Sequence, residues 1–109
     1  MDALMSASPA GEDAERLAER GMLIDAAAGS REAFAHLYDL TSAGVLGLIL
    51  SRVGDRRSAE DLLLETYVRA WQRACDFAAY HGAARAWICA LALQVIVERS
   101  DGAAQEPAA

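Results

Sequence analysis

Apolar residues recur at three- and four-residue steps along this 109-residue chain. The clearest run lies in the stretch from residue 34 to residue 49 and consists of Phe34, Leu37, Tyr38, Val45, Leu48 and Ile49. Because an α-helix has about 3.6 residues per turn, this spacing places the apolar side chains on one face of a helix. No segment shows a convincing two-residue alternation of a strand. The sequence therefore predicts an all-α fold, a compact three- to four-helix bundle.

Capping residues and glycines divide the pattern into four expected helices. Ser30 and Ser58 are the expected N-caps, and Asp61 completes a capping-box variant with Ser58. Glycines mark the expected helix ends, and weaker helix formers predict a bend at Gly21 and a kink near residues 41–44. The expected helices cover about 12–28, 31–53, 58–75 and 84–99. The expected organisation is a flexible tail over 1–11, a domain over 12–102, and a tail or linker start over 103–109.

Charge and composition narrow the function classes. The net charge is −6, and residues 1–25 carry a net −4 of it, so the chain is not an obvious nucleic-acid binder. The longest apolar run, residues 86–97, is shorter than the about 20 residues that a membrane span needs. Cys75 and Cys89 lack a paired-cysteine motif and are expected to be buried, reduced thiols. Without a secretory leader, a cytoplasmic helical protein is expected.

The sequence offers no arrangement typical of an active site. It contains no nucleophile–base pair, no glycine-rich phosphate loop and no paired carboxylates in apolar surroundings. His36 and His81 have no neighbouring ligand set, so no metal is expected. The chain is predicted not to be an enzyme and to need no cofactor.

The expected helix over 58–75 has two apolar stripes. The first is its core face, formed by Ala59, Leu63, Tyr67, Ala70, Trp71 and Ala74. The opposite face is polar, and a solvated charged surface is the simplest interpretation of it. Leu64 and Val68 do not fit that interpretation, because they lie on the flank of the polar face among acids. An apolar strip fringed by carboxylates favours docking on a partner that carries arginines.

Three segments together resemble region 2 of the extracytoplasmic-function sigma factors, the promoter-recognition subunits of bacterial RNA polymerase. They are LIDAAAGSREAFAHLYD, VGDRRSAEDLLLETYVRAW and HGAARAWI, in the order and spacing of that family, and the resemblance covers about residues 22–101. It implies that the third helix docks on the clamp helices of the largest polymerase subunit. It also implies that the following loop holds a flipped base of the −10 element, and that the last helix faces DNA.

The resemblance assigns two sets of residues. The polymerase-binding set is Asp61, Leu64, Glu65, Val68, Arg69 and Gln72. The DNA-binding set is Phe77, Tyr80, His81, Arg85, Gln94 and Arg99. Arg52, Arg56 and Arg57 form the densest basic cluster, which is either a solvated turn or a contact to the DNA backbone. An anti-sigma factor is a further partner that the family implies.

The last helix departs from the family. Leu93, Val95 and Asp101 stand where family members usually carry arginine or asparagine, and Leu64 replaces a frequent glutamine. Two hypotheses follow. The chain is either a working promoter-recognition domain, or a sigma-like interaction module that occupies polymerase or an anti-sigma factor without useful DNA binding.

Overall fold

The computed structural model describes the backbone of residues 3–80 and 82–105, and the side chains of residues 11–80 and 82–100. Throughout this part of the chain the regular elements are helices, which confirms the all-α prediction. They are α1 (Ala3–Ala27), α2 (Arg31–Val53), α3 (Arg56–Gln72), the 3₁₀ helix η1 (Ala74–Ala79) and α4 (Ala84–Gln105).

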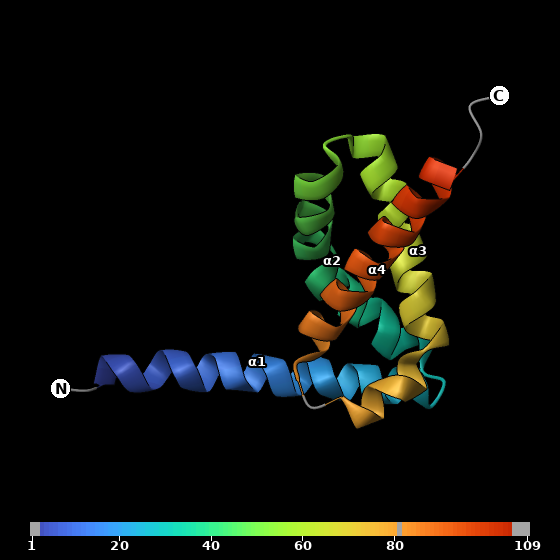
Figure 1. The fold of residues 1–109 in the computed structure, drawn as a ribbon. Helices are drawn as coiled ribbons and strands as arrows, with labels where there is room; N and C mark the ends of the chain where they lie inside the picture. The colour runs from blue at the N-terminus through green and yellow to red at the C-terminus, as the bar shows by residue number, and fades with distance from the viewer. Residues whose placement is uncertain (1–2, 81, 106–109) are drawn as a thin grey trace.

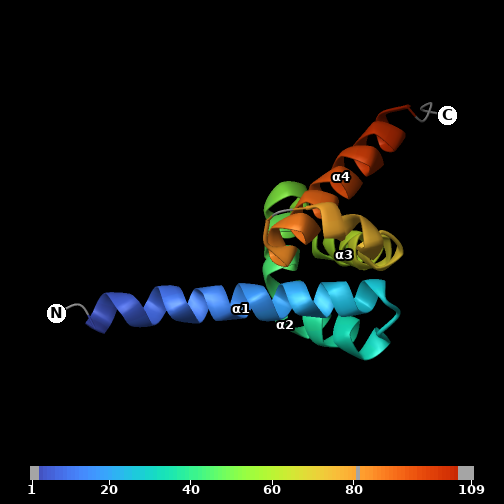
Figure 2. The ribbon, with the colours of Figure 1, turned by 90° about the horizontal axis from the view of Figure 1, so that it is seen from below.

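Helices α2, α3 and α4 form the body of the molecule, and α1 lies across one end of it (Figure 1). Helix α1 packs on α2, η1 and α4, while α2, α3 and α4 also pack against one another. The N-terminal part of α1 projects beyond the other helices, as the view from below also shows (Figure 2). The short helix η1 turns the chain under α1 before α4 begins.

The core collects the apolar faces that helical periodicity predicts. Its largest fully buried apolar side chains are Phe77, Leu23, Leu37, Ile49, Ile88, Val45 and Val95. The predicted core face of α3 is confirmed for Leu63 and Tyr67, whereas Trp71 is only partly buried. Leu62 and Thr66 are buried as well, so α3 presents a wider face to the core than predicted.

A buried hydrogen bond joins α2 to α3. The Thr41 hydroxyl donates to the Leu37 carbonyl at 2.8 Å, and its oxygen lies 2.6 Å from the Tyr67 hydroxyl. Because a hydroxyl has one proton to donate, Tyr67 is the donor in the second bond. Burial raises the pKa of Tyr67 to about 12, which keeps this donor protonated. The bond from Thr41 to a carbonyl one turn earlier also favours bending, and α2 changes direction near its middle without interruption (Figure 1).

Several predicted helix boundaries were wrong. Helix α1 begins at Ala3, so most of the segment predicted as a flexible tail is helical, and the helix continues through Gly21. Helix α4 continues through Gly102 to Gln105. A helix-interior glycine costs only about 1 kcal/mol, so glycine alone does not end a helix. At Gly29 the backbone adopts φ 106°, and there the predicted stop is confirmed. The remaining part of the domain division stays a prediction.

The N-cap of α2 is Ser30, as predicted, but the N-cap of α3 is Asp55 and not Ser58. The Asp55 carboxylate accepts a hydrogen bond from the Ser58 backbone N–H at 2.9 Å. Gly54 ends α2 in the left-handed conformation, with φ 74°. Asp55 follows in extended conformation and precedes the first residue of α3. Ser58 therefore lies inside the first turn.

We expect Asp55→Ala to destabilise the domain more than Ser58→Ala does. Loss of an N-cap carboxylate should lower the thermal midpoint by about 4–8 °C at neutral pH. Hydrogen bonds from the Ser58 side chain and backbone lower the pKa of Asp55. The stabilisation is therefore complete above the unfolded-state pKa and disappears as pH falls through the lower folded-state pKa. Thermal unfolding followed by circular dichroism at pH 7 and pH 3 tests this, and an equal or larger loss in Ser58→Ala would contradict the assignment.

Helix α2 is long and apolar enough to cross a membrane by length and composition alone. Its buried stripe, Leu37, Thr41, Val45 and Ile49, faces the protein core. Because α2 packs against α1, α3 and α4 through this stripe, we interpret it as a core helix.

Candidate functional site

The outward face of α3 carries the predicted apolar strip. Leu64 is 62% exposed and Val68 is 53% exposed, one helical turn apart. Asp61 is exposed beside them, and Glu65 is partly exposed. The predicted exposure of an apolar pair among carboxylates is therefore confirmed, whereas its role in docking is a matter for proposal.

The strip forms one wall of an apolar groove between α2 and α3. The groove has a volume of about 410 Å³ and is lined by Arg31, Phe34, Ala35, Tyr38, Leu64, Tyr67, Val68, Trp71 and Gln72. Its aromatic side chains pack edge to face, with ring centroids 5.3 Å apart for Phe34 and Trp71 and 4.7 Å apart for Tyr38 and Tyr67. Such packing holds the rings in fixed orientations. The groove is therefore a preformed apolar surface.

The wall on α2 was missed from the sequence. Phe34 and Tyr38 were assigned to the core stripe of their helix, but both are only partly buried. The sequence signal for this groove was a pair of aromatic residues one turn apart on each helix. The pairs are Phe34 and Tyr38 on α2, and Tyr67 and Trp71 on α3.

The polar side of α3 is tied to α4 by a cluster of ion pairs. The Glu65 carboxylate lies 2.7 Å from Arg99 and 3.4 Å from Arg69, and Arg69 lies 2.8 Å from Glu98. Hydrogen bonding to Arg69 lowers the pKa of Glu98. We call these four residues the α3–α4 ion-pair cluster. It uses two predicted polymerase contacts, Glu65 and Arg69, and one predicted DNA contact, Arg99.

Arg69 is less exposed than its predicted place on the polar face of α3 implies. Its side chain is only 16% exposed, and its Nη1 atom is buried without a hydrogen-bond partner. Hydrogen bonding to Glu98 raises the pKa of Arg69. The prediction treated α3 as an isolated helix and did not include α4, which covers this arginine. Gln72, in contrast, is exposed at one end of the groove.

Phe77 lies in the core and not on the surface, so its predicted contact with a base stays a prediction that this burial does not favour. Its side chain is fully buried, with its ring centroid 5.5 Å from that of Trp87. The Arg20 guanidinium covers the ring at 4.5 Å from its centroid. Sequence reasoning treated residues 76–85 as a loop, whereas η1 turns Phe77 inward beneath α1. Tyr80 is partly buried beside Phe77, and His81 lies outside the described residues.

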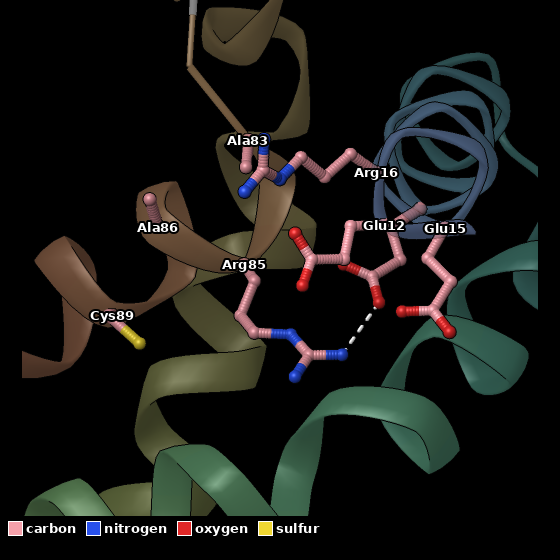
Figure 3. A pocket seen from close by; sticks show the side chains of 8 residues that line it. Glu12, Glu15, Arg16, Ala83, Arg85, Ala86 and Cys89 are labelled. Atoms are coloured by element: carbon pink, nitrogen blue, oxygen red, sulfur yellow. Dashed lines mark hydrogen bonds and ion pairs between the residues drawn. The ribbon is translucent and has the colours of Figure 1, made fainter. Parts of the chain in front are cut away.

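A second cleft separates α1 from the start of α4 (Figure 3). It has a volume of about 420 Å³ and is lined by Glu12, Glu15, Arg16, Glu19, Ala83, Arg85, Ala86 and Cys89. Arg85 points into it and donates to the Glu19 carboxylate at 2.6 Å (Figure 3, dashed line). The Glu19 side chain is only 8% exposed, so this ion pair is largely removed from water on its acidic side.

Two consecutive residues of α1 therefore hold the segment that the resemblance assigns to promoter DNA. Glu19 pairs with Arg85, and Arg20 donates to the Gly82 carbonyl at 3.0 Å. The acidic character of the N-terminal segment is visible in the sequence, but its partners are not, because they lie more than sixty positions away. Gln94, the remaining predicted DNA contact, is exposed on α4.

Among the described residues, no group of three or more histidine, cysteine or acidic side chains could hold a metal ion. Cys75 and Cys89 are free thiols in the structure. Cys75 is exposed rather than buried, which corrects the expectation for that residue, and Cys89 is partly buried. Burial raises the pKa of the Cys89 thiol.

The fold is a small helical domain with an exposed apolar groove between α2 and α3. Comparison with known proteins identifies its family. The family model for sigma-70 region 2 matches residues 37–102, from the second turn of α2 into α4. The chain belongs to this family. The family consists of non-enzymatic transcription initiation factors, in agreement with the prediction that the chain is not an enzyme.

The names of curated relatives also describe them as sigma factors. The chain is 35% identical over 78 residues to the ECF RNA polymerase sigma factor SigK of Mycobacterium ulcerans, covering 72% of this chain and 42% of the relative. It is 35% identical over 89 residues to the ECF RNA polymerase sigma factor BldN of Streptomyces coelicolor, covering 82% of this chain and 33% of the relative. The chain thus spans less than half the length of these relatives. No solved structure matches it.

Proposed function

We propose that this chain is the promoter-recognition domain of a cytoplasmic transcription initiation factor. It binds core RNA polymerase through α3 and engages −10 promoter DNA through the segment from η1 to α4. The observation that carries the proposal is the α2–α3 groove. The exposed Leu64 and Val68 line this groove together with aromatic side chains, and the acids Asp61 and Glu65 are their neighbours on α3.

This groove has the properties of a protein interface. Its lining is mostly aromatic and aliphatic, with Arg31 and Gln72 as the polar members. An apolar centre with polar groups around it is typical of specific interfaces. The acids Asp61 and Glu65 favour a partner that brings arginine or lysine. The resemblance implies the clamp helices of RNA polymerase as this partner, and the names of the curated relatives include RNA polymerase.

DNA binding is the weaker half of the proposal. Arg85 is paired with Glu19 and Arg99 with Glu65, so both predicted phosphate contacts are internally neutralised. The net charge of −6 also opposes long-range attraction to DNA. These observations favour a second candidate function, an interaction module that occupies polymerase or an anti-sigma factor without useful DNA binding.

Fluorescence anisotropy with labelled single-stranded −10 DNA separates the two functions. For the domain alone, we expect a Kd weaker than about 10⁻⁵ M at physiological salt, because phosphate contacts supply most of the affinity and two are masked. With core polymerase present, we expect sequence-dependent binding. A salt series identifies the electrostatic share, and a scrambled oligonucleotide is the control.

Each outcome decides a different point. Polymerase binding without any preference for the −10 sequence supports the interaction module. Sub-micromolar, sequence-dependent binding by the domain alone refutes the dependence on polymerase. A folded domain that fails to bind core polymerase refutes the main proposal.

A further inference from the structure

Glu65 links the proposed polymerase-binding face of α3 to Arg99, a predicted DNA contact on α4. It follows Leu64, which lines the groove, directly in α3, and its side chain is 40% exposed. One of its carboxylate oxygens accepts from Arg99 of α4 at 2.7 Å, and the other from Arg69 at 3.4 Å. The same carboxylate is thus partly open to solvent beside the exposed Leu64 and holds an arginine of the predicted DNA surface.

We propose that Glu65 is a gate that couples the two surfaces. In the free domain it neutralises Arg99. When a basic group of the partner pairs with Glu65, Arg99 is released and becomes available to a DNA phosphate. This inference rests on the proposed function and adds to it a route by which polymerase binding strengthens DNA binding.

Displacing Arg99 from Glu65 costs little free energy, whereas displacing Arg69 would cost more. The Arg99 side chain is about half exposed, so its ion pair contributes little stability and a competing cation can displace it. Arg69 is held in place by burial and by its 2.8 Å contact to Glu98. Arg69 therefore keeps its ion pair with Glu98 of α4, while Arg99 leaves Glu65.

The coupling has a bounded size. An exposed ion pair of this kind contributes an amount equivalent to about a two- to fivefold change in an equilibrium constant. The exchange therefore adjusts DNA affinity by that factor and does not act as an all-or-none switch. Because coupling is reciprocal, DNA must strengthen partner binding by the same factor.

Glu65→Gln tests the gate in the free domain, since it removes the charge that holds Arg99. At about 20 mM salt we expect this variant to bind single-stranded −10 DNA about two- to fivefold more tightly than Asp61→Asn does. Asp61→Asn is the matched control, because it removes one charge from the same exposed face and Asp61 forms no ion pair among the described residues. One added phosphate contact should also steepen the slope of log K against log salt by about 0.7.

Two further measurements complete the test. Arg99→Gln in the Glu65→Gln background should remove the gain, and the gain should disappear when core polymerase already engages Glu65. Equal affinities of Glu65→Gln and Asp61→Asn overturn the gate, as does the absence of measurable binding by either. If the higher DNA affinity of Glu65→Gln persists on polymerase, the coupling is overturned. If the wild-type domain does not bind polymerase, the proposed function itself is contradicted.

Discussion

The double substitution Leu64→Arg and Val68→Arg is expected to abolish binding of the chain to core RNA polymerase while its helix content stays unchanged. Both side chains are more than half exposed in the free domain, so their replacement disturbs no core contact. On the partner side, the substitution removes two apolar anchors and places two cations where basic groups are expected. Loss of a central apolar contact costs about 2 kcal/mol, so the loss of two should lower affinity by about 1,000-fold.

The matched control is Leu17→Arg with Ile24→Arg. These residues are large, exposed apolar side chains in the described part of α1, Leu17 being 70% exposed, and they do not line the groove. The control makes the same change in charge and apolar area at another place. Pull-down or biolayer interferometry with core polymerase, together with circular dichroism, provides the measurement. Full binding by a folded Leu64/Val68 variant, or an equal loss in the control, contradicts the assignment of the α3 face.

The exposed strip on α3 could be predicted because it depends on one helix only. Helical periodicity fixes the angle between Leu64 and the core face regardless of what surrounds α3. The groove could not be predicted in the same way. Its second wall depends on how α2 and α3 cross, and the periodicity of each helix contains no information about the crossing angle.

The ion pairs show the same limit more strongly. Glu19 and Arg85 are 66 positions apart, and Glu65 and Arg99 are 34 positions apart. Each residue looks like an ordinary solvated charge in the sequence. Only the packing of α1 and α3 against α4 turns two predicted DNA contacts into internally paired groups, which changes the expected DNA affinity of the free domain.

Local competition explains the error at the start of α3. Asp55 and Ser58 are both favourable N-cap residues, separated by less than one helical turn. The choice between them is made by Gly54, whose positive φ ends α2 and brings Asp55 directly to the next helix start. The glycine was recognised as a helix end, but its effect on the following cap was not.

Phe77→Ala is expected to lower the free energy of unfolding by about 3–5 kcal/mol, the usual cost of removing a fully buried aromatic ring. The ring is completely buried, packs against Trp87 and lies beneath the Arg20 guanidinium. Its loss would open a cavity where α1, η1 and α4 meet. For a domain of this size, such a loss is a large share of the total stability.

Urea denaturation followed by circular dichroism measures the effect, with Tyr80→Ala as the control in the same segment. Tyr80 is only partly buried, so its removal should cost clearly less stability. A base-contacting, exposed Phe77 predicts the opposite pattern, in which Phe77→Ala leaves stability within about 0.5 kcal/mol and weakens DNA binding on polymerase. Because the two roles require opposite burial of the same ring, a stability loss of several kcal/mol would assign Phe77 to the core. The base-contacting role would then fall to the exposed groups of α4 and to the segment that follows η1.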